Sequence, residues 1–160
     1  MIERRFVDGI WMYRPAVNVK DCRPEWPEQV DVVAWIREHY PDHAALMFHP
    51  ANEGDIPPQY RQDQIKAGLL KGVSDLIFLK GGAQHSGAVI EMKRCWWKSK
   101  ASPEQIEFLK SAANEGKFAA ICNGADAAKI AFMDFKNGLS CAEESVMVIS
   151  PIIGGGHEKV

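Results

Sequence analysis

Two apolar runs on either side of a glycine-rich stretch dominate the hydrophobic pattern of the chain. Residues 76–79 read Leu-Ile-Phe-Leu, and residues 87–93 read Gly-Ala-Val-Ile-Glu-Met-Lys. Such a pair of runs, joined by a loop that contains glycines, predicts a β-hairpin. The first run is almost continuously apolar, which is typical of a central strand that is covered on both faces.

Charged residues interrupt this hairpin at regular positions. Asp75 stands at the head of the first run, and Glu91 and Lys93 lie two residues apart in the second. Residues two apart on a strand point to the same face, roughly 6.6 Å from each other. Burying such charges is unfavourable unless they pair or bind a metal. The hairpin is therefore the first place to expect chemistry.

Helical and strand patterns continue on both sides of the hairpin. Ser102 and Gln105 form a capping box with proline in the first turn, which predicts the start of a helix. The predicted elements, in order, are a helix over 27–40, a strand over 44–49, a helix over 59–70, the hairpin, a helix from 102, a strand over 118–122 and a helix over 125–135 capped by Asn123. This order predicts an α/β domain with a central mixed β-sheet flanked by helices.

The two ends of the chain show weaker patterns. Residues 1–26 carry aromatic residues and prolines without a clear period, and we expect an N-terminal arm or small hairpin packed on the domain. Residues 27–153 are expected to form that domain, and the part from 140 to 153 is apolar but ambiguous between strand and helix. Residues 154–160 are expected to be a flexible tail.

Composition limits the class of protein. The chain has 160 residues, which suits one domain, and a formal net charge of −2. No apolar run approaches the ~20 residues needed to cross a bilayer, and the N-terminus lacks the apolar core of a signal peptide. Four scattered cysteines without a CxxC pair argue against a zinc site. We expect a cytoplasmic protein with no membrane partner.

The charged positions of the hairpin resemble a known nuclease signature. Asp75, a hairpin and then Glu91-x-Lys93 are similar to the PD-(D/E)XK pattern. Further motifs narrow the resemblance to the VRR-NUC branch, the virus-type replication-repair nucleases: His49 to Gly54, Lys71-Gly72, and Ser102-Pro103-Glu104-Gln105. The resemblance runs from about Glu28 to about Phe135. The chain departs from the family at Ser74, where a proline usually precedes the aspartate and helps to fix the strand entry.

The resemblance implies a restriction-endonuclease-like core and a DNA endonuclease that depends on Mg²⁺ or Mn²⁺. Asp75 and Glu91 would hold the metal, together with the backbone carbonyl of Met92. Lys93 would position the attacking water or stabilise charge on the phosphate in the transition state. Gln105 would orient a ligand or the phosphate.

Two further carboxylates are candidates for the metal site. Glu53 lies in a loop after a strand, where an acid is usually only part of a turn. Beside Asp75 and Glu91 it becomes a candidate ligand and catalytic residue, since a hard divalent cation takes several oxygen ligands. Glu28 stands in the first turn of the helix over 27–40. It either joins the metal site or only complements the helix dipole.

Cations and indoles near these motifs predict contacts with DNA. Cations attract phosphates, and indoles stack on exposed bases. The alternative is that the tryptophans are buried and the lysines solvated, and we expect one tryptophan of each kind. The candidate DNA-binding residues are Arg61, Lys66, Lys71, Arg94, Trp96, Trp97, Lys98 and Lys100.

The function predicted from these residues and the resemblance is structure-selective hydrolysis of DNA. Stand-alone members of the family are similar to enzymes that resolve four-way (Holliday) junctions in DNA repair, which implies a homodimer acting on branched DNA. A bacterial host cell, with a phage gene as the source, is the setting that such short forms suggest. The alternatives are a nickase or flap nuclease without junction preference, and a catalytically silent DNA-binding module of the same fold.

Overall fold

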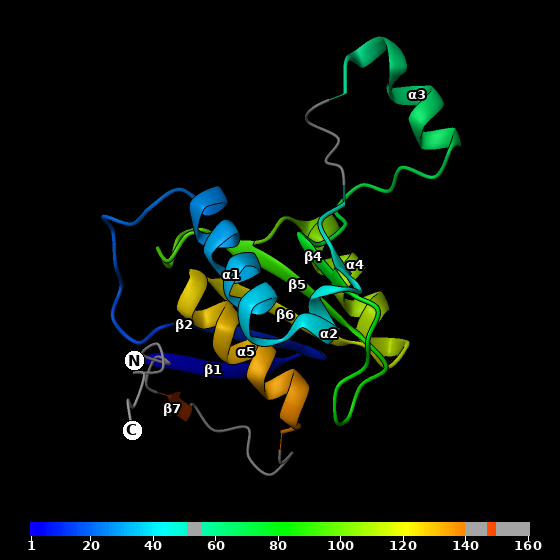
Figure 1. Cartoon of the computed structure of the whole chain (residues 1–160). Helices are drawn as coiled ribbons and strands as arrows, with labels where there is room; N and C mark the ends of the chain where they lie inside the picture. Colours follow the sequence, from blue (N-terminus) through cyan, green and yellow to red (C-terminus); the bar gives the residue numbers. More distant parts are fainter. Residues whose placement is uncertain (51–55, 140–146, 150–160) are drawn as a thin grey trace.

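One mixed β-sheet organises the molecule (Figure 1). The computed structural model describes residues 1–50, 56–139 and 147–149. In these residues the strands follow one another across the sheet in the order β3-β4-β5-β6-β2-β1-β7. The strands are β1 (Ile2–Val7), β2 (Ile10–Pro15), β3 (Met47–Phe48), β4 (Leu76–Phe78), β5 (Ala88–Lys93), β6 (Phe118–Asn123) and β7 (Met147–Ile149). The helices are α1 (Glu25–His39), α2 (Pro41–Ala44), α3 (Pro58–Lys66), α4 (Pro103–Asn114) and α5 (Ala125–Asn137).

The strand pairing confirms the predicted α/β class. β4 and β5 form the antiparallel hairpin expected over residues 76–93, with Leu76 opposite Ile90. β5 pairs parallel with β6, and β6 pairs parallel with β2. The central strands are therefore parallel and the outer pairs antiparallel, which makes the sheet mixed.

Helices cover both faces of the sheet, and the residues of β6 alternate between the two layers. Phe118, Ala120 and Cys122 face the cluster built with α1 and α5. Ala119 and Ile121 face the cluster built with α4. All of β6 is consequently buried, as expected for a strand covered on both sides.

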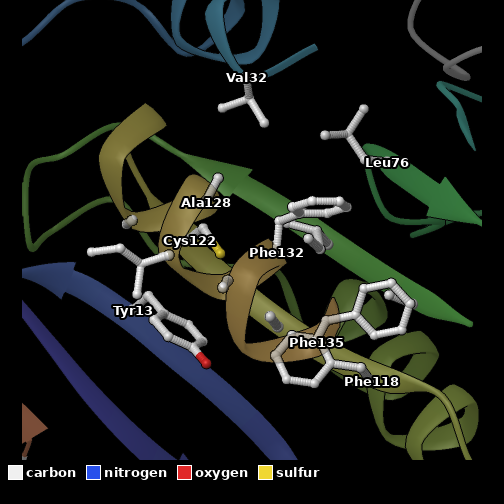
Figure 2. Packing of buried hydrophobic residues seen from close by; sticks show 14 of the residues in the cluster. Tyr13, Val32, Leu76, Phe118, Cys122, Ala128, Phe132 and Phe135 are labelled. Carbon is white, nitrogen blue, oxygen red and sulfur yellow. The ribbon is translucent and has the colours of Figure 1, made fainter. Parts of the chain in front are cut away.

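Aromatic side chains of α5 form the centre of the larger cluster (Figure 2). Phe132 is fully buried, and its ring lies 5.0 Å from that of Tyr40 and 5.6 Å from that of Phe78. Phe135 lies 5.7 Å from Phe118. These centroid separations fall in the range in which aromatic pairs attract each other. The cluster thus joins α5 to the sheet and to the end of α1.

The N-terminal residues contribute to the same sheet. β1 and β2 form an antiparallel hairpin with a turn at Asp8 and Gly9, both at positive φ. Arg4 and Tyr13 both bond to Asp134 of α5, at 2.9 and 2.7 Å. The expected small hairpin therefore exists. It extends the sheet of the expected 27–153 domain through the β2–β6 pairing and does not lie on it as a separate layer.

Several predicted helix boundaries differ from the structure by one to four residues, and two of them have a clear physical reason. α1 begins at Glu25 and not at Pro27. The proline is accommodated because amide groups in the first turn of a helix have no intrahelical acceptor. α3 ends at Lys66, four residues early, since Gly68 adopts φ 105°, the left-handed conformation that ends helices.

The predicted cap of α5 also needs correction. Gly124, at φ 93°, is its N-cap, and not Asn123. The Asn123 side chain instead donates to the carbonyls of Arg94 and Ser99, at 2.8 and 3.2 Å. It therefore holds the loop that follows β5 and does not cap the helix.

The ends of the chain are described only in part. β7 shows that residues 147–149, in the segment that was ambiguous between strand and helix, pair antiparallel with β1. The expected tail over 154–160 lies outside the described residues. Among the described helices, none combines the length and the apolar composition that a membrane crossing requires.

Phe132 offers a direct test of this packing. Phe132→Ala should lower the free energy of unfolding by about 3–5 kcal/mol, because a large buried ring is removed and the close-packed cluster cannot collapse to fill the space. Phe6→Ala is the matched control, since Phe6 is 47% exposed. Chemical denaturation measures both. Equal losses in the two variants would contradict the assigned core.

Candidate active site

The β4–β5 hairpin brings Asp75 and Glu91 together. Asp75 directly precedes β4, so the register that pairs Leu76 with Ile90 sets Asp75 across from Glu91. The carboxylate Oδ2 of Asp75 accepts a hydrogen bond from the backbone N–H of Met92 at 2.8 Å. This bond fixes the Asp75 side chain against β5, next to Glu91.

Strand alternation decides which residues of β5 are available for chemistry. Ile90 and Met92 point into the larger core, whereas Val89 points to the α4 side of the sheet. Glu91 and Lys93 share the side of Val89. Glu91 is 0% exposed and Lys93 is 7% exposed. Two charged side chains are thus buried in an otherwise apolar strand.

The two oxygens of Glu91 differ in their surroundings. Oε1 accepts a hydrogen bond from Lys93 Nζ at 2.6 Å and another from Gln105 Nε2. Oε2 is buried and has no hydrogen-bond partner among the described residues. Burial, and next the nearby negative charge of Asp75, raise the pKa of Glu91 to about 8. The negative charge of the Glu91 carboxylate is therefore only partly compensated by neighbouring donors.

Lys93 keeps its charge in this setting. Burial lowers the pKa of the ammonium group, but the hydrogen bond to Glu91 and the charges of Glu91, Glu25 and Asp75 outweigh it. The net effect is a pKa above the ordinary value for lysine. Lys93 therefore supplies a fixed positive charge at the site.

Gln105 forms the predicted capping box and also hydrogen-bonds to Glu91. Its backbone N–H donates to Ser102 Oγ at 3.3 Å, and its Oε1 accepts from the N–H of Ser102 at 2.8 Å. This capping box leaves Nε2 to donate to Glu91. The side-chain amide of Gln105 thus caps α4 and also orients the buried carboxylate of Glu91.

Glu25, which the sequence analysis missed, is the acid of α1 at this site. Its Oε2 lies 3.8 Å from Lys93 Nζ. Burial raises the pKa of Glu25, and the charge of Asp75 raises it further, although Lys93 opposes the shift. The sequence offered one signal for it, an acid two residues before Pro27. The signal was overlooked because the helix was expected to start at that proline.

Glu28 lies elsewhere and performs a different task. Its Oε2 accepts from the N–H of Ala125 at 2.6 Å, and its Oε1 accepts from Arg23 Nε at 3.0 Å. Both oxygens are used in these contacts, so the structure does not bring Glu28 to the metal candidates. It does not simply complement its own helix either, because it caps the N-terminus of α5.

His49 takes part in fixing the entry of β4, where the family usually has a proline. Ser74 is fully buried at the expected proline position. The next carbonyl, that of Asp75, lies 2.7 Å from His49 Nδ1, and Gln29 Nε2 lies 3.0 Å from the same nitrogen. The position of Asp75 is thus secured by His49, which directly follows β3 and is itself contacted by Gln29 of α1, without a proline ring.

A pocket of about 190 Å³ opens beside Asp75. Gly72 is required at its wall, since it adopts φ 79° and an added Cβ would lie 2.6 Å from the backbone of Glu104. Lys71 Nζ pairs with Glu104 Oε1 at 2.8 Å, and this pair is largely exposed. The lining includes His49, Lys71, Ser74, Asp75, Ser102 and Gln105. A polar pocket of this kind, lined by the carboxylate of Asp75, has room for a phosphate group.

The tryptophans after β5 contact the protein itself. Trp97 Nε1 donates to the carbonyl of Pro15 at 2.9 Å, and the Arg14 guanidinium lies 4.2 Å from its ring. Trp96 Nε1 is buried without a hydrogen-bond partner in the described part of the chain. Both indoles are half-buried, so the expected contrast between one buried and one exposed tryptophan is absent from these two residues.

The candidate DNA-binding cations fall into two groups. Arg94, Lys98 and Lys100 are exposed on the loop after β5, where Arg94 Nη2 also donates to the carbonyl of Cys22 at 2.9 Å. Arg61 and Lys66 lie on α3, which projects away from the sheet (Figure 1). The structure thus leaves these side chains accessible on two separate elements.

The donor set fits a hard divalent cation in its chemistry. Two carboxylates face each other, and one of their oxygens is buried without a donor, which a cation would satisfy. Glu53 lies outside the described residues. Among the described residues, no cluster of three or more His, Cys, Asp or Glu side chains forms a complete metal cage. A metal here would rely on backbone, water or phosphate oxygens as well.

The different tasks of Glu28 and Glu25 can be separated by mutation. Glu28→Ala should lower the free energy of unfolding by about 1–2 kcal/mol, because α5 loses its capping acceptor. Glu25→Gln should leave stability nearly unchanged. Glu38→Ala is the control on the same helix, since the Glu38 side chain is 77% exposed. A fully stable Glu28 variant that has lost affinity for Mg²⁺ in calorimetry would reverse the assignment.

The raised pKa of Glu91 predicts a pH dependence of the metal-free protein. The folded state favours protonated Glu91, so its contribution to stability is present at low pH and is lost as pH rises towards about 8. His43 and His85 have lowered pKa values and act in the opposite direction below pH 6.5. Between pH 6.5 and 8, Glu91 alone should therefore lower stability in EDTA by no more than about 1.4 kcal/mol per pH unit.

Glu91→Gln should flatten that slope, since glutamine does not titrate. Glu25 also has a raised pKa and contributes in the same direction, so some slope should remain. Denaturant titrations at pH 6.5 and 8 measure the difference. An unchanged slope in the Glu91 variant would show that the carboxylate is already ionised without a metal.

Comparison with known proteins gives a match in structure and none in sequence. No protein-family model matches the chain, and no curated protein matches it. A solved structure described as a "VRR_NUC domain protein" superposes with a TM-score of 0.61 at 22% sequence identity. The match covers 72% of this chain and 89% of that chain. The predicted restriction-endonuclease-like core is thereby confirmed, and the chain has the VRR-NUC fold that its sequence motifs predicted.

Proposed function

We propose that this chain is a divalent-metal-dependent, structure-selective DNA endonuclease of the Holliday-junction-resolving type. The observation that carries the proposal is the buried Oε2 of Glu91, which has no hydrogen-bond partner among the described residues, on a strand position that lies across from Asp75. A buried carboxylate oxygen without a hydrogen-bond donor is unfavourable unless another group, such as a bound cation, compensates its charge. A purely structural or silent module has no need of such an arrangement.

The ligands proposed for Mg²⁺ or Mn²⁺ are the carboxylates of Asp75 and Glu91 and the backbone carbonyl of Met92. Glu25 replaces Glu28 as the candidate from α1, because it lies beside Lys93. Glu53 is retained as a candidate ligand and catalytic residue on its sequence alone. When bound, the cation would supply Lewis acidity for hydrolysis of the phosphodiester.

The residues of the chain would perform the remaining work. In the hydrolysis, a water oxygen forms a bond to phosphorus while the bond from phosphorus to the bridging ester oxygen breaks. The water loses a proton to solvent, and the leaving oxygen takes up a proton from solvent to become a hydroxyl group. Lys93 provides a positive charge held by Glu91, and a preorganised charge of this kind stabilises the negative charge that builds up on phosphate. Gln105 keeps Oε1 of Glu91 occupied, so that Oε2 is the oxygen available for a ligand.

Contacts with the rest of the DNA are assigned to the exposed cations. Arg94, Lys98 and Lys100 would meet phosphates near the site, and Arg61 and Lys66 of α3 would meet them further away. Lys71 is placed at the pocket wall, where its pairing with Glu104 would compete with phosphate. Two symmetric cuts at a junction would require a homodimer.

The central experiment compares Asp75→Asn and Glu91→Gln with the wild type on labelled linear, flapped and four-way DNA in Mg²⁺. Each substitution should reduce cleavage by at least roughly a hundredfold, since it removes a metal ligand, while the protein stays folded. Glu38→Gln, a surface carboxylate, is the matched control. EDTA should abolish wild-type cleavage.

The outcomes separate the rival functions. Cleavage of flapped but not four-way DNA would favour a flap nuclease, and single-strand cuts in linear duplex would favour a nickase. DNA binding without cleavage, with no Mg²⁺ binding by calorimetry, would favour a silent module. Near-wild-type cutting by either variant would overturn the assigned site.

A further inference from the structure

Trp26 has an unusual position for a tryptophan. Of the five tryptophans in the chain, all of which are described, Trp26 is the most exposed, at 62%. The other four are half-buried. An indole carries a large apolar surface that usually contributes to a core or an interface. The exposure of Trp26 therefore leaves a large apolar surface available to a ligand or partner.

Trp26 stands between two residues that touch the candidate active site. Its neighbour in the first turn of α1 is Glu25, which lies 3.8 Å from Lys93 Nζ. Its ring contacts the ring of His49 at 71° with a centroid separation of 5.8 Å. His49 in turn lies 2.7 Å from the carbonyl of Asp75 and lines the pocket beside that residue. The indole thus marks the rim of the site on the α1 side.

The side chain is also held in place without being covered. A first-turn position on a helix and the edge contact with His49 restrict its rotamers, while most of its surface remains in water. A rigid aromatic group of this kind loses little conformational entropy when it binds a planar partner. Removing it should leave the core intact.

The chemistry of the site selects the planar partner. If a phosphodiester occupies the pocket by Asp75, the adjoining nucleotides extend over its rim. Both faces of a base in continuous duplex are already stacked on neighbouring bases, whereas a base at a branch, flap or bulge has a free face. Stacking of such bases on aromatic side chains is a general mode of single-strand recognition.

We propose that Trp26 forms a stacking subsite for an unpaired nucleobase next to the phosphate that is cut. The subsite rests on the proposed nuclease function and gives it a physical basis for choosing branched over linear DNA. It also assigns to Trp26 the role that the sequence suggested for Trp96 or Trp97, both of which contact the protein itself.

The test is a binding experiment in EDTA, so that affinity is measured without cleavage. Fluorescein-labelled flapped and linear duplexes of the same sequence are titrated with wild type, Trp26→Ala, Trp26→Phe and Phe6→Ala. Phe6 is the control, an exposed aromatic residue on β1, which is separated from β5 by β6 and β2. Thermal melts confirm that the variants fold.

Trp26→Ala should weaken binding to flapped DNA by about 5- to 150-fold and leave linear duplex within about twofold. Trp26→Phe should retain most of the affinity, since it keeps an aromatic face. Phe6→Ala should bind both DNAs as the wild type does.

A second arm identifies the base. An abasic nucleotide is placed in turn at each position beside the branch. At one position the abasic nucleotide should weaken DNA binding by the wild type as much as Trp26→Ala does. DNA binding by the Trp26→Ala variant should not weaken further with that abasic DNA, because the substitution and the abasic nucleotide remove the same contact.

Several results would overturn the inference. Equal loss on flapped and linear DNA would indicate a general surface effect, and additive losses at every abasic position would show that no base stacks on Trp26. A change from dimer to monomer in sedimentation would identify the indole as a contact between copies. Trp26-dependent binding of flapped DNA without any cleavage would support the subsite and remove the proposed nuclease activity.

Discussion

A carboxylate buried in the middle of a sheet is the constraint on which the rest of this structure depends. Glu91 is fully enclosed, and neighbouring residues must offset its negative charge. Lys93 and Gln105 do so at one oxygen and leave the other without a partner among the described residues. The same burial raises the pKa of Glu91, and a bound cation, as proposed, would offset that effect. Stability and chemistry thus act against each other at a single side chain.

The site is assembled from the beginnings of helices. The capping box of α4 provides Gln105, and the first turn of α1 provides Glu25. The first amide of α5 is taken by Glu28, which anchors α1 beside the end of β6. Helix starts present unpaired N–H groups and favour acids, so acidic and amide side chains gather there. The sheet then needs to supply only the Asp75, Glu91 and Lys93 positions.

Local patterns predicted the hairpin, the capping box and the mixed sheet because each depends on residues close in sequence. Asp75, Glu91 and Lys93 were placed together by strand register alone. Local patterns could not predict that Glu25, and not Glu28, is the acid of α1 that lies at the candidate site. It depends on Arg23 and Ala125, which occupy Glu28, and on where a helix containing Pro27 begins. Likewise, asparagine is a common N-cap residue, but the side-chain amide of Asn123 donates to loop carbonyls that are distant in sequence. The exposure of Trp26 left no trace in the hydrophobic pattern.

The projecting helix α3 has consequences for how tightly the molecule holds anything. It has nine residues, and every one of them is exposed. Isolated helices shorter than about 12–15 residues are only marginally stable in water, so little in the chain itself keeps α3 ordered. Part of the free energy of any contact made by Arg61 or Lys66 is then used to order the helix. Such contacts are therefore weaker than the same charges would make on a rigid helix.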